Sequence, residues 1–132
     1  MRNKLMVFAL FGALLLGFST SVFAAGEKPG QVVKNYFVQM SKGEWTAAKK
    51  YLASKELQQM ITGLEGIYKE LPAAEKKKDA MDSFGAQANM KLVSEKITGN
   101  KAVVVFTYVE KKKTKKDKLN LEKIGGVWKI VD

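Results

Sequence analysis

The sequence contains no cysteine and no histidine, and its 132 residues include only two prolines. Without cysteine, neither disulfide bonds nor thiol chemistry can contribute to stability or function. Without histidine, the chain lacks the commonest general base, the commonest transition-metal ligand and the usual pH switch. These absences argue against zinc, copper and haem sites and against Ser-His or Cys-His nucleophiles, so we expect no cofactor and no metal.

Arginine is almost as scarce. Arg2 is the only arginine, and every other basic side chain of the chain is a lysine. Lysine is a strongly hydrated point charge and lacks the planar fork with which arginine grips phosphate or guanine in two places. We therefore expect no sequence-specific binding to nucleic acid, whereas attraction to polyanions through charge alone stays open.

No apolar run reaches the length of about 20 residues that a membrane-spanning helix needs. The first 24 residues instead have the three parts of a secretory signal peptide: Arg2 and Lys4, an apolar stretch over residues 5–18, and Val22-Phe23-Ala24 before the expected cleavage point. No cysteine follows that could carry a lipid. These features predict a signal peptide over residues 1–24, export by the general secretory route, and a periplasmic or secreted protein.

The remaining chain, residues 25–132, is predicted to form a single α+β domain. It carries 21 lysines against 13 acidic residues, a net charge of +8. At this size a chain can hold one hydrophobic core without metal or disulfide crosslinks.

The first part of this domain is predicted to be helical. Apolar residues recur at helical spacing from Pro29 until Gly43, again over residues 44–53, and from Ser54 until Pro72, with a fourth helix over residues 73–85. Gly63 and Gly66 weaken the third helix and predict a kink or a break near them.

The second part is rich in β-branched residues. Short apolar runs over residues 90–97, 101–110, 118–124 and 127–131 predict four strands in hairpin succession, separated at two places by Gly99-Asn100 and Gly125-Gly126. Residues 102–106 are apolar on both faces, which predicts a central strand covered on both sides for part of its length. The order of elements predicts N-terminal helices packed on one face of a curved four-stranded antiparallel sheet.

Three segments in this order resemble secreted bacterial members of the nuclear-transport-factor-2-like superfamily. They are residues 29–37 (PGQVVKNYF), 42–48 (KGEWTAA) and 121–130 (LEKIGGVWKI), and the likeness covers nearly all of the chain after the signal peptide. The resemblance implies a cone-shaped domain, in which a curved sheet wraps around the helices and a pocket opens between the concave face and the first helix. The branch it resembles has no known function and often carries a lipid, for which this chain lacks the cysteine.

Aromatic and apolar residues at helix and strand spacing are the candidates for lining such a pocket, because ligand sites are mostly apolar with a few polar tips. The candidates are Tyr36, Phe37, Met40, Phe106, Tyr108 and Trp128. Each of these residues is more often plain core, with Trp128 closing the end of the cone. Tyr36 and Tyr108 are the better site candidates, since a buried hydroxyl needs a partner.

A run of lysines is the strongest charge feature. Residues 110–118 carry a net charge of +4, and the candidate anion-binding residues are Lys111, Lys112, Lys113, Lys115, Lys116 and Lys118. This hairpin could meet phosphate groups of lipids or wall polymers, or it could be a solvated hairpin whose lysines discourage strand pairing between molecules. No aromatic residue interleaves with the lysines, so no stacking platform for single-stranded nucleic acid is expected.

Three functions remain open from the sequence. The first is an exported, non-catalytic binding or structural module of the cell envelope that takes a small apolar ligand or an envelope protein. The second is an adaptor for polyanions or membrane surfaces that uses residues 111–118. The third is a small hydrolase or isomerase that uses Tyr36 or Tyr108, although no catalytic residue is assigned. Homodimer formation is not decided by the sequence.

Overall fold

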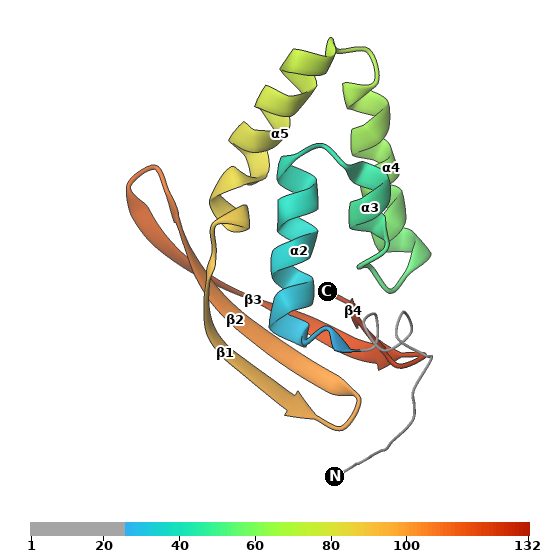
Figure 1. Cartoon of the computed structure of the whole chain (residues 1–132), viewed down its shortest axis with the longest axis vertical. Coiled ribbons are helices and arrows are strands. Elements are labelled where there is room, and N and C mark those ends of the chain that lie inside the picture. Colours follow the sequence, from blue (N-terminus) through green and yellow to red (C-terminus); the bar gives the residue numbers. More distant parts are fainter. Residues whose placement is uncertain (1–25) are drawn as a thin grey trace, which may run out of the picture.

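A computed structural model describes residues 26–132, so the expected signal peptide lies outside the described residues. Helices come first and strands follow, as the sequence predicts (Figure 1). The elements are α2 (Pro29–Ser41), α3 (Trp45–Lys49), α4 (Lys55–Tyr68), α5 (Ala73–Ala88), β1 (Lys91–Thr98), β2 (Lys101–Glu110), β3 (Lys113–Ile124) and β4 (Val127–Ile130).

Helix α2 ends where its local sequence dictates. Gly43 has a φ of 72°, a left-handed conformation that glycine adopts without steric cost. In this turn the Gly43 N–H donates to the carbonyl of Met40, and the Glu44 N–H donates to the carbonyl of Gln39. These two bonds satisfy carbonyls that the helix end would otherwise leave unpaired, so the chain turns sharply into α3.

The N-terminal end of α2 is capped from the sheet. Lys28 precedes the helix and supplies no side-chain cap, and the first turn contains no acidic residue. Instead, the Gly30 N–H donates to Oε1 of Glu95 in β1 over 2.7 Å. A Cβ atom at Gly30 would lie only 2.9 Å from that oxygen, so glycine permits the close approach between helix and strand.

The segments after α2 differ from the sequence-based expectation in their lengths. Helix α3 stops at Lys49 rather than near residue 53, because Leu52 forms a parallel bridge with Ile130 and the Ala53 N–H donates to the Ile130 carbonyl. Helix α4 begins after Ser54, whose hydroxyl accepts from the Leu57 N–H. It continues to Tyr68 as one helix without the break expected near its glycines, and α5 reaches Ala88, three residues beyond the predicted end.

The four strands form an antiparallel sheet in the order β1-β2-β3-β4. Strand β3 begins at Lys113, five residues before the predicted start, because residues 113–117 pair with residues 106–110 of β2. The lysines there hide the strand signal, which depends on alternating apolar residues. Most of the lysine run is therefore a strand rather than a loop.

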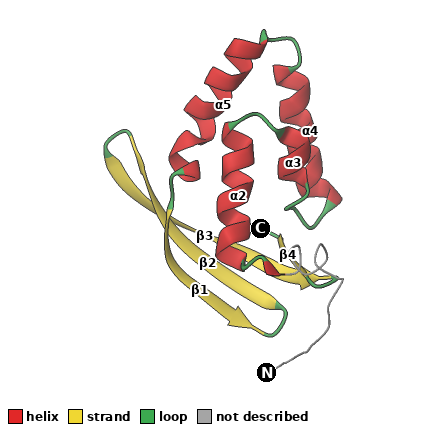
Figure 2. Cartoon of the chain, in the orientation of Figure 1, coloured by secondary structure: helices red, strands yellow, loops and turns green. Residues whose placement is uncertain are grey.

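Helices cover one face of this sheet only, which corrects the expectation for β2 (Figure 2). Ala102, Val104 and Phe106 are buried under the helices, whereas the alternating Val103 and Val105 are only partly buried. Residues 102–106 are apolar on both faces, but the outer face carries no covering helix among residues 26–132.

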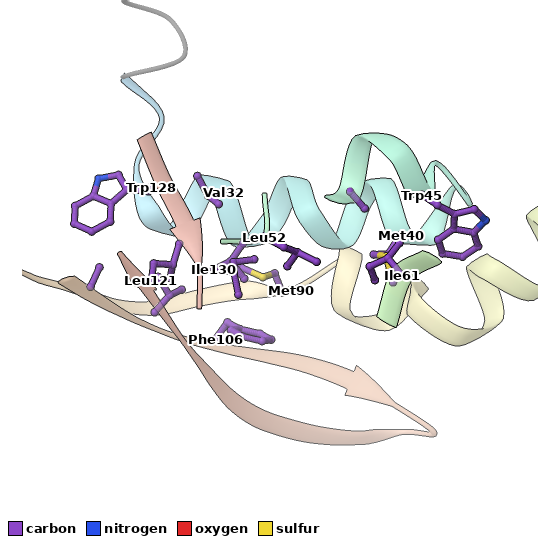
Figure 3. Close-up of a cluster of buried hydrophobic side chains, with 14 of the residues drawn as sticks. Val32, Met40, Trp45, Leu52, Ile61, Met90, Phe106, Leu121, Trp128 and Ile130 are labelled. Carbon is purple, nitrogen blue, oxygen red and sulfur yellow. The ribbon is translucent and has the colours of Figure 1, made fainter. Parts of the chain in front are cut away.

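The core lies between α2 and the inner face of the sheet (Figure 3). Val32, Val33 and Met40 of α2 are packed with Val104 and Phe106 of β2, and each is at most 1% exposed. The core continues through the following residues of α3, α4 and the C-terminal strands: Trp45, Ala48, Leu52, Ile61, Leu121, Trp128 and Ile130.

Candidate binding groove and basic surfaces

Three of the six predicted pocket residues lie in the core, and the other three lie at its border. Met40 and Phe106 are 1% exposed and Trp128 is 6% exposed, all three within the hydrophobic core. Tyr36, Phe37 and Tyr108 are half-buried and pack against that core. Phe37 lies 5.7 Å from Phe106, and Phe106 lies 6.1 Å from Tyr108, measured between ring centroids. These contacts place the rings of Phe37, Phe106 and Tyr108 in a row between α2 and β2.

A groove of about 760 Å³ lies elsewhere, between α5 and the end of the β2–β3 hairpin. Of the six predicted residues, Tyr108 alone lines it. The other lining residues come from α5 (Met81, Asp82, Gly85, Ala86, Asn89), from the start of β1 (Lys91) and from the hairpin (Thr107, Val109, Glu110, Lys111, Thr114). Its volume falls within the range of about 300–1,000 Å³ that is usual for small-molecule sites, although it opens widely to solvent.

One wall of the groove is a free strand edge. The pairing of β1 with β2 begins at Lys91 and Thr107, so residues 108–110 of β2 extend past the partner strand. On that side, no other strand among residues 26–132 pairs with them. The groove therefore combines apolar side chains, a tyrosine and unpaired backbone groups, which suits a ligand with both apolar and hydrogen-bonding parts.

Two carboxylates line the groove, and one of them is engaged. Lys115 Nζ lies 2.8 Å from Oε1 of Glu110. The hydrogen bond from Lys115 and its charge lower the pKa of Glu110, so this carboxyl stays ionised at neutral pH. Asp82 on α5 is exposed. The ion pair with Lys115 therefore does not favour Glu110 as a general acid.

A second, smaller hollow of about 500 Å³ lies beside α3 and α4. Its lining includes Trp45 and Tyr68, whose rings stack with centroids 5.2 Å apart, together with Thr62, Glu65 and Lys69. The stacked rings hold α4 against α3, so the aromatic pair serves packing.

A polar cluster at the N-terminal end of α2 could not be foreseen from the sequence pattern. Asn35 donates to Oε2 of Glu27 over 2.5 Å, and its own Oδ1 accepts from Gln31 over 2.9 Å. Burial raises the pKa of Tyr51 nearby, and the charge of Glu27 raises it further. Burial also raises the pKa of Tyr36 on the same helix. Both phenols therefore stay protonated at neutral pH, so neither is poised as a base.

The predicted anion-binding lysines separate into three groups. Lys111 and Lys112 form the tip of the hairpin, and Lys113 opens β3 beside them. Lys115 lies opposite Tyr108 on the inner side and pairs with Glu110. Lys116 and Lys118 lie opposite Thr107 and Val105, and therefore on the outer face of the sheet. All six are exposed. The pairing register of β2 and β3, rather than nearness in the sequence, decides which of these lysines lie on the same face.

The tip has an unusual backbone for its residues. Lys111 and Lys112 have φ values of 53° and 65°. A two-residue hairpin loop with positive φ at both positions is a type I′ turn, in which Asn-Gly is strongly preferred. Long side chains in this conformation cost about 1–2 kcal/mol per residue relative to glycine.

No helix of residues 26–132 is long and apolar enough to cross a membrane. Over the same residues, no group of three or more acidic side chains is arranged to hold a metal ion.

These elements define the class of protein. Helices followed by an open four-stranded antiparallel sheet form an α+β fold of the nuclear-transport-factor-2-like (NTF2-like) type. The chain is similar to the crystal structure of a protein described as an NTF2-like transpeptidase from Campylobacter jejuni, with a TM-score of 0.54 and 16% identity. The match covers 80% of this chain and 99% of that chain, and at this identity it shows the fold alone.

A family model places the chain more narrowly. The model for a domain of unknown function, DUF4878, matches residues 22–131, so the chain belongs to that family. No curated protein matches the chain.

Proposed function

We propose that this chain is an exported, non-catalytic binding module of the cell envelope whose ligand lies in the groove between α5 and the β2–β3 hairpin. The observation that carries the proposal is the groove itself, which is lined by Met81, Ala86, Tyr108 and Val109 and by the free edge of β2. A small molecule with an apolar body and a few hydrogen-bonding groups fits this lining.

The lining also supports a non-catalytic role. The similar protein from Campylobacter jejuni is described as a transpeptidase, and acyl transfer needs an activated nucleophile. The groove offers the hydroxyls of Thr107, Tyr108 and Thr114, but the chain contains no histidine to activate them and no cysteine. The alternative of a hydrolase or isomerase has a similar difficulty, because Glu110, one of the two carboxylates that line the groove, is bound to Lys115.

Native mass spectrometry of the protein isolated gently from the envelope of its own host tests this proposal. We expect a discrete extra mass on the wild-type protein. Ala86→Trp fills the groove and should abolish the extra mass, and Tyr108→Phe should weaken its retention. Thr62→Trp in the smaller hollow beside α4 is the control and should keep it.

A wild-type protein that carries no extra mass would contradict a groove ligand. Retention that is equal in Ala86→Trp would place the ligand elsewhere on the protein.

A second function is favoured by the hairpin tip. We propose that residues 111–118 contact an anionic surface, because Lys111 and Lys112 occupy turn positions where Asn-Gly would be more stable. Backbone strain that a protein retains is typical of functional segments. A hairpin whose lysines served solubility alone could carry them in the strands and keep a relaxed turn.

Binding to long-chain polyphosphate tests this second function. The Lys111→Asn/Lys112→Gly variant should bind more weakly than the wild type at low salt, and both should release in 0.5 M salt because screening weakens exposed charges. Binding that is unchanged by salt or by these substitutions would refute it.

A further inference from the structure

The two faces of the sheet carry different charged residues. Lys96 of β1 lies opposite Val103, Lys118 of β3 lies opposite Val105, and Lys116 lies opposite Thr107, so all three share the outer face with the partly exposed valines. The alternation of side chains along each strand places Glu95, Glu110 and Asp117 on the inner side. A row of small apolar residues flanked by lysines therefore runs along the middle of the outer face.

These lysines have no acidic partners among the described residues. The one carboxylate of β1–β3 on the outer face is Glu122, which lies opposite Lys101 at the far end. Lys96, Lys116 and Lys118 are exposed and form no ion pair within residues 26–132. Their positive charge is thus free to meet an external anion.

A shallow hollow lies within this row. It has a volume of about 300 Å³ and is lined by Val105, Lys116, Asp117 and Lys118. The carboxylate of Asp117 accepts from the backbone N–H of Lys118 over 2.8 Å, so part of its charge is directed to the backbone. The apolar side chain of Val105 and the two lysines, Lys116 and Lys118, together suit a phosphate group joined to an apolar body.

We infer that the outer face of β1–β3 docks on an anionic phospholipid bilayer, with the valine row at the headgroup level and Lys96, Lys116 and Lys118 against the phosphates. This inference rests on the second proposed function for its anionic partner, and it adds the sheet face to the hairpin tip as a contact. Each lysine near an anionic leaflet adds to the attraction, so three on one face act together.

Other occupants fit the face less well. Protein interfaces are enriched in aromatic residues and arginine and depleted in lysine, and this face has neither aromatic residue nor arginine on β1–β3. The missing aromatic rings also disfavour single-stranded nucleic acid. A second copy of this chain would bring like charges together, which opposes self-association through this face.

Co-sedimentation of the full chain with vesicles of phosphatidylcholine alone, or with 30% phosphatidylglycerol, tests the inference. We expect binding at 50 mM NaCl only to the anionic vesicles, and release at 500 mM NaCl.

A Lys96→Gln/Lys116→Gln/Lys118→Gln variant should bind at least about tenfold more weakly. Its matched control, Lys55→Gln/Lys77→Gln/Lys78→Gln, removes the same charge from exposed positions of α4 and α5 and should bind as the wild type does. Lys91 is left unchanged because it also lines the groove.

Amine-reactive labelling of the wild-type protein gives a readout that needs no variant. Anionic vesicles should protect Lys96, Lys116 and Lys118 from labelling and leave Lys55, Lys77 and Lys78 reactive. Protection of the same face lysines in concentrated protein without vesicles would overturn the inference in favour of self-association.

The remaining outcomes separate this inference from the second function. Loss of vesicle binding in Lys111→Asn/Lys112→Gly alone, with no loss in the face variant, would overturn the face and leave the tip as the contact. Equal loss in the α4/α5 control would show that binding depends on net charge alone and would overturn the sheet face as the contact. Binding to polyphosphate without binding to anionic vesicles would refute the lipid surface while the second function stands.

Discussion

At the scale of single residues, Glu95 links the sheet to the first helix of the core. Its carboxylate accepts the Gly30 N–H at 2.7 Å, at a helix end that has no local cap. A negative charge at this position also meets the positive end of the helix dipole. Glu95 thus caps the N-terminal end of α2 from a distant strand, as Ser54 caps α4 from the adjacent residue.

We expect Glu95→Ala to lower the free energy of unfolding by about 1–2 kcal/mol, the usual cost of removing a helix cap. Glu95→Gln keeps an acceptor and loses the charge, so it should cost less than half as much. Urea denaturation followed by circular dichroism measures both. Equal losses for the two variants would show that charge, rather than the hydrogen bond, carries the effect.

At the scale of elements, the β2–β3 hairpin reaches beyond β1 and forms both the groove and the lysine surface. Its last three β2 residues have a free edge, and its turn carries two lysines with positive φ. The same element therefore serves both proposed contacts, one on each side. Because its turn is strained, substitutions there can be tested by their effect on stability without any ligand.

The Lys111→Asn/Lys112→Gly variant should be more stable than the wild type by about 1 kcal/mol, because Asn-Gly fits a type I′ turn. We expect a melting temperature several degrees higher for a domain of this size. Differential scanning calorimetry measures the change. A lower melting temperature would mean that the lysine side chains make stabilising contacts at the tip.

At the scale of the whole molecule, stability is expected to be uneven. Helix α4 has one buried residue, Ile61, and exposes Met60 and Ile67 at 65% and 70%. Its links to α3 include the stacked Trp45–Tyr68 pair and the Lys49–Glu65 ion pair at 3.0 Å. By contrast, α2 and β2 lie in the centre of the core, and β4 joins the helices to the sheet through Ile130.

We expect amides of α4 to exchange with solvent about 100-fold faster than those in the middle of β2, because segments with few buried contacts open locally. Native-state hydrogen exchange by mass spectrometry measures this. Equal protection of α4 and β2 would show that the domain opens only as one cooperative unit.

Much of the fold follows from the sequence because its causes are local. The helical apolar stripe of residues 32–40, the Gly43 turn and the Ser54 cap all act within a few residues, and the structure confirms each of them. The fold that the resemblance implies, of the nuclear-transport-factor-2-like type, is confirmed as well, as is the antiparallel sheet with helices on one face. The expected signal peptide and export stay predictions, since residues 1–25 lie outside the described part.

Tertiary structure alone decided the candidate sites. Whether an aromatic residue lines a cavity or fills the core depends on what the rest of the chain packs against it. Phe106 is buried in the core, whereas Tyr108, two positions later in β2, lines the groove. The run of lysines shows charge but not direction, since strand register determines that Lys115 lies on one side and Lys116 and Lys118 on the other. Lys96, about twenty residues earlier, joins them only because β1 pairs with β2. The sequence determined composition, charge and local structure, and the long-range pairing of strands determined which residues form a surface.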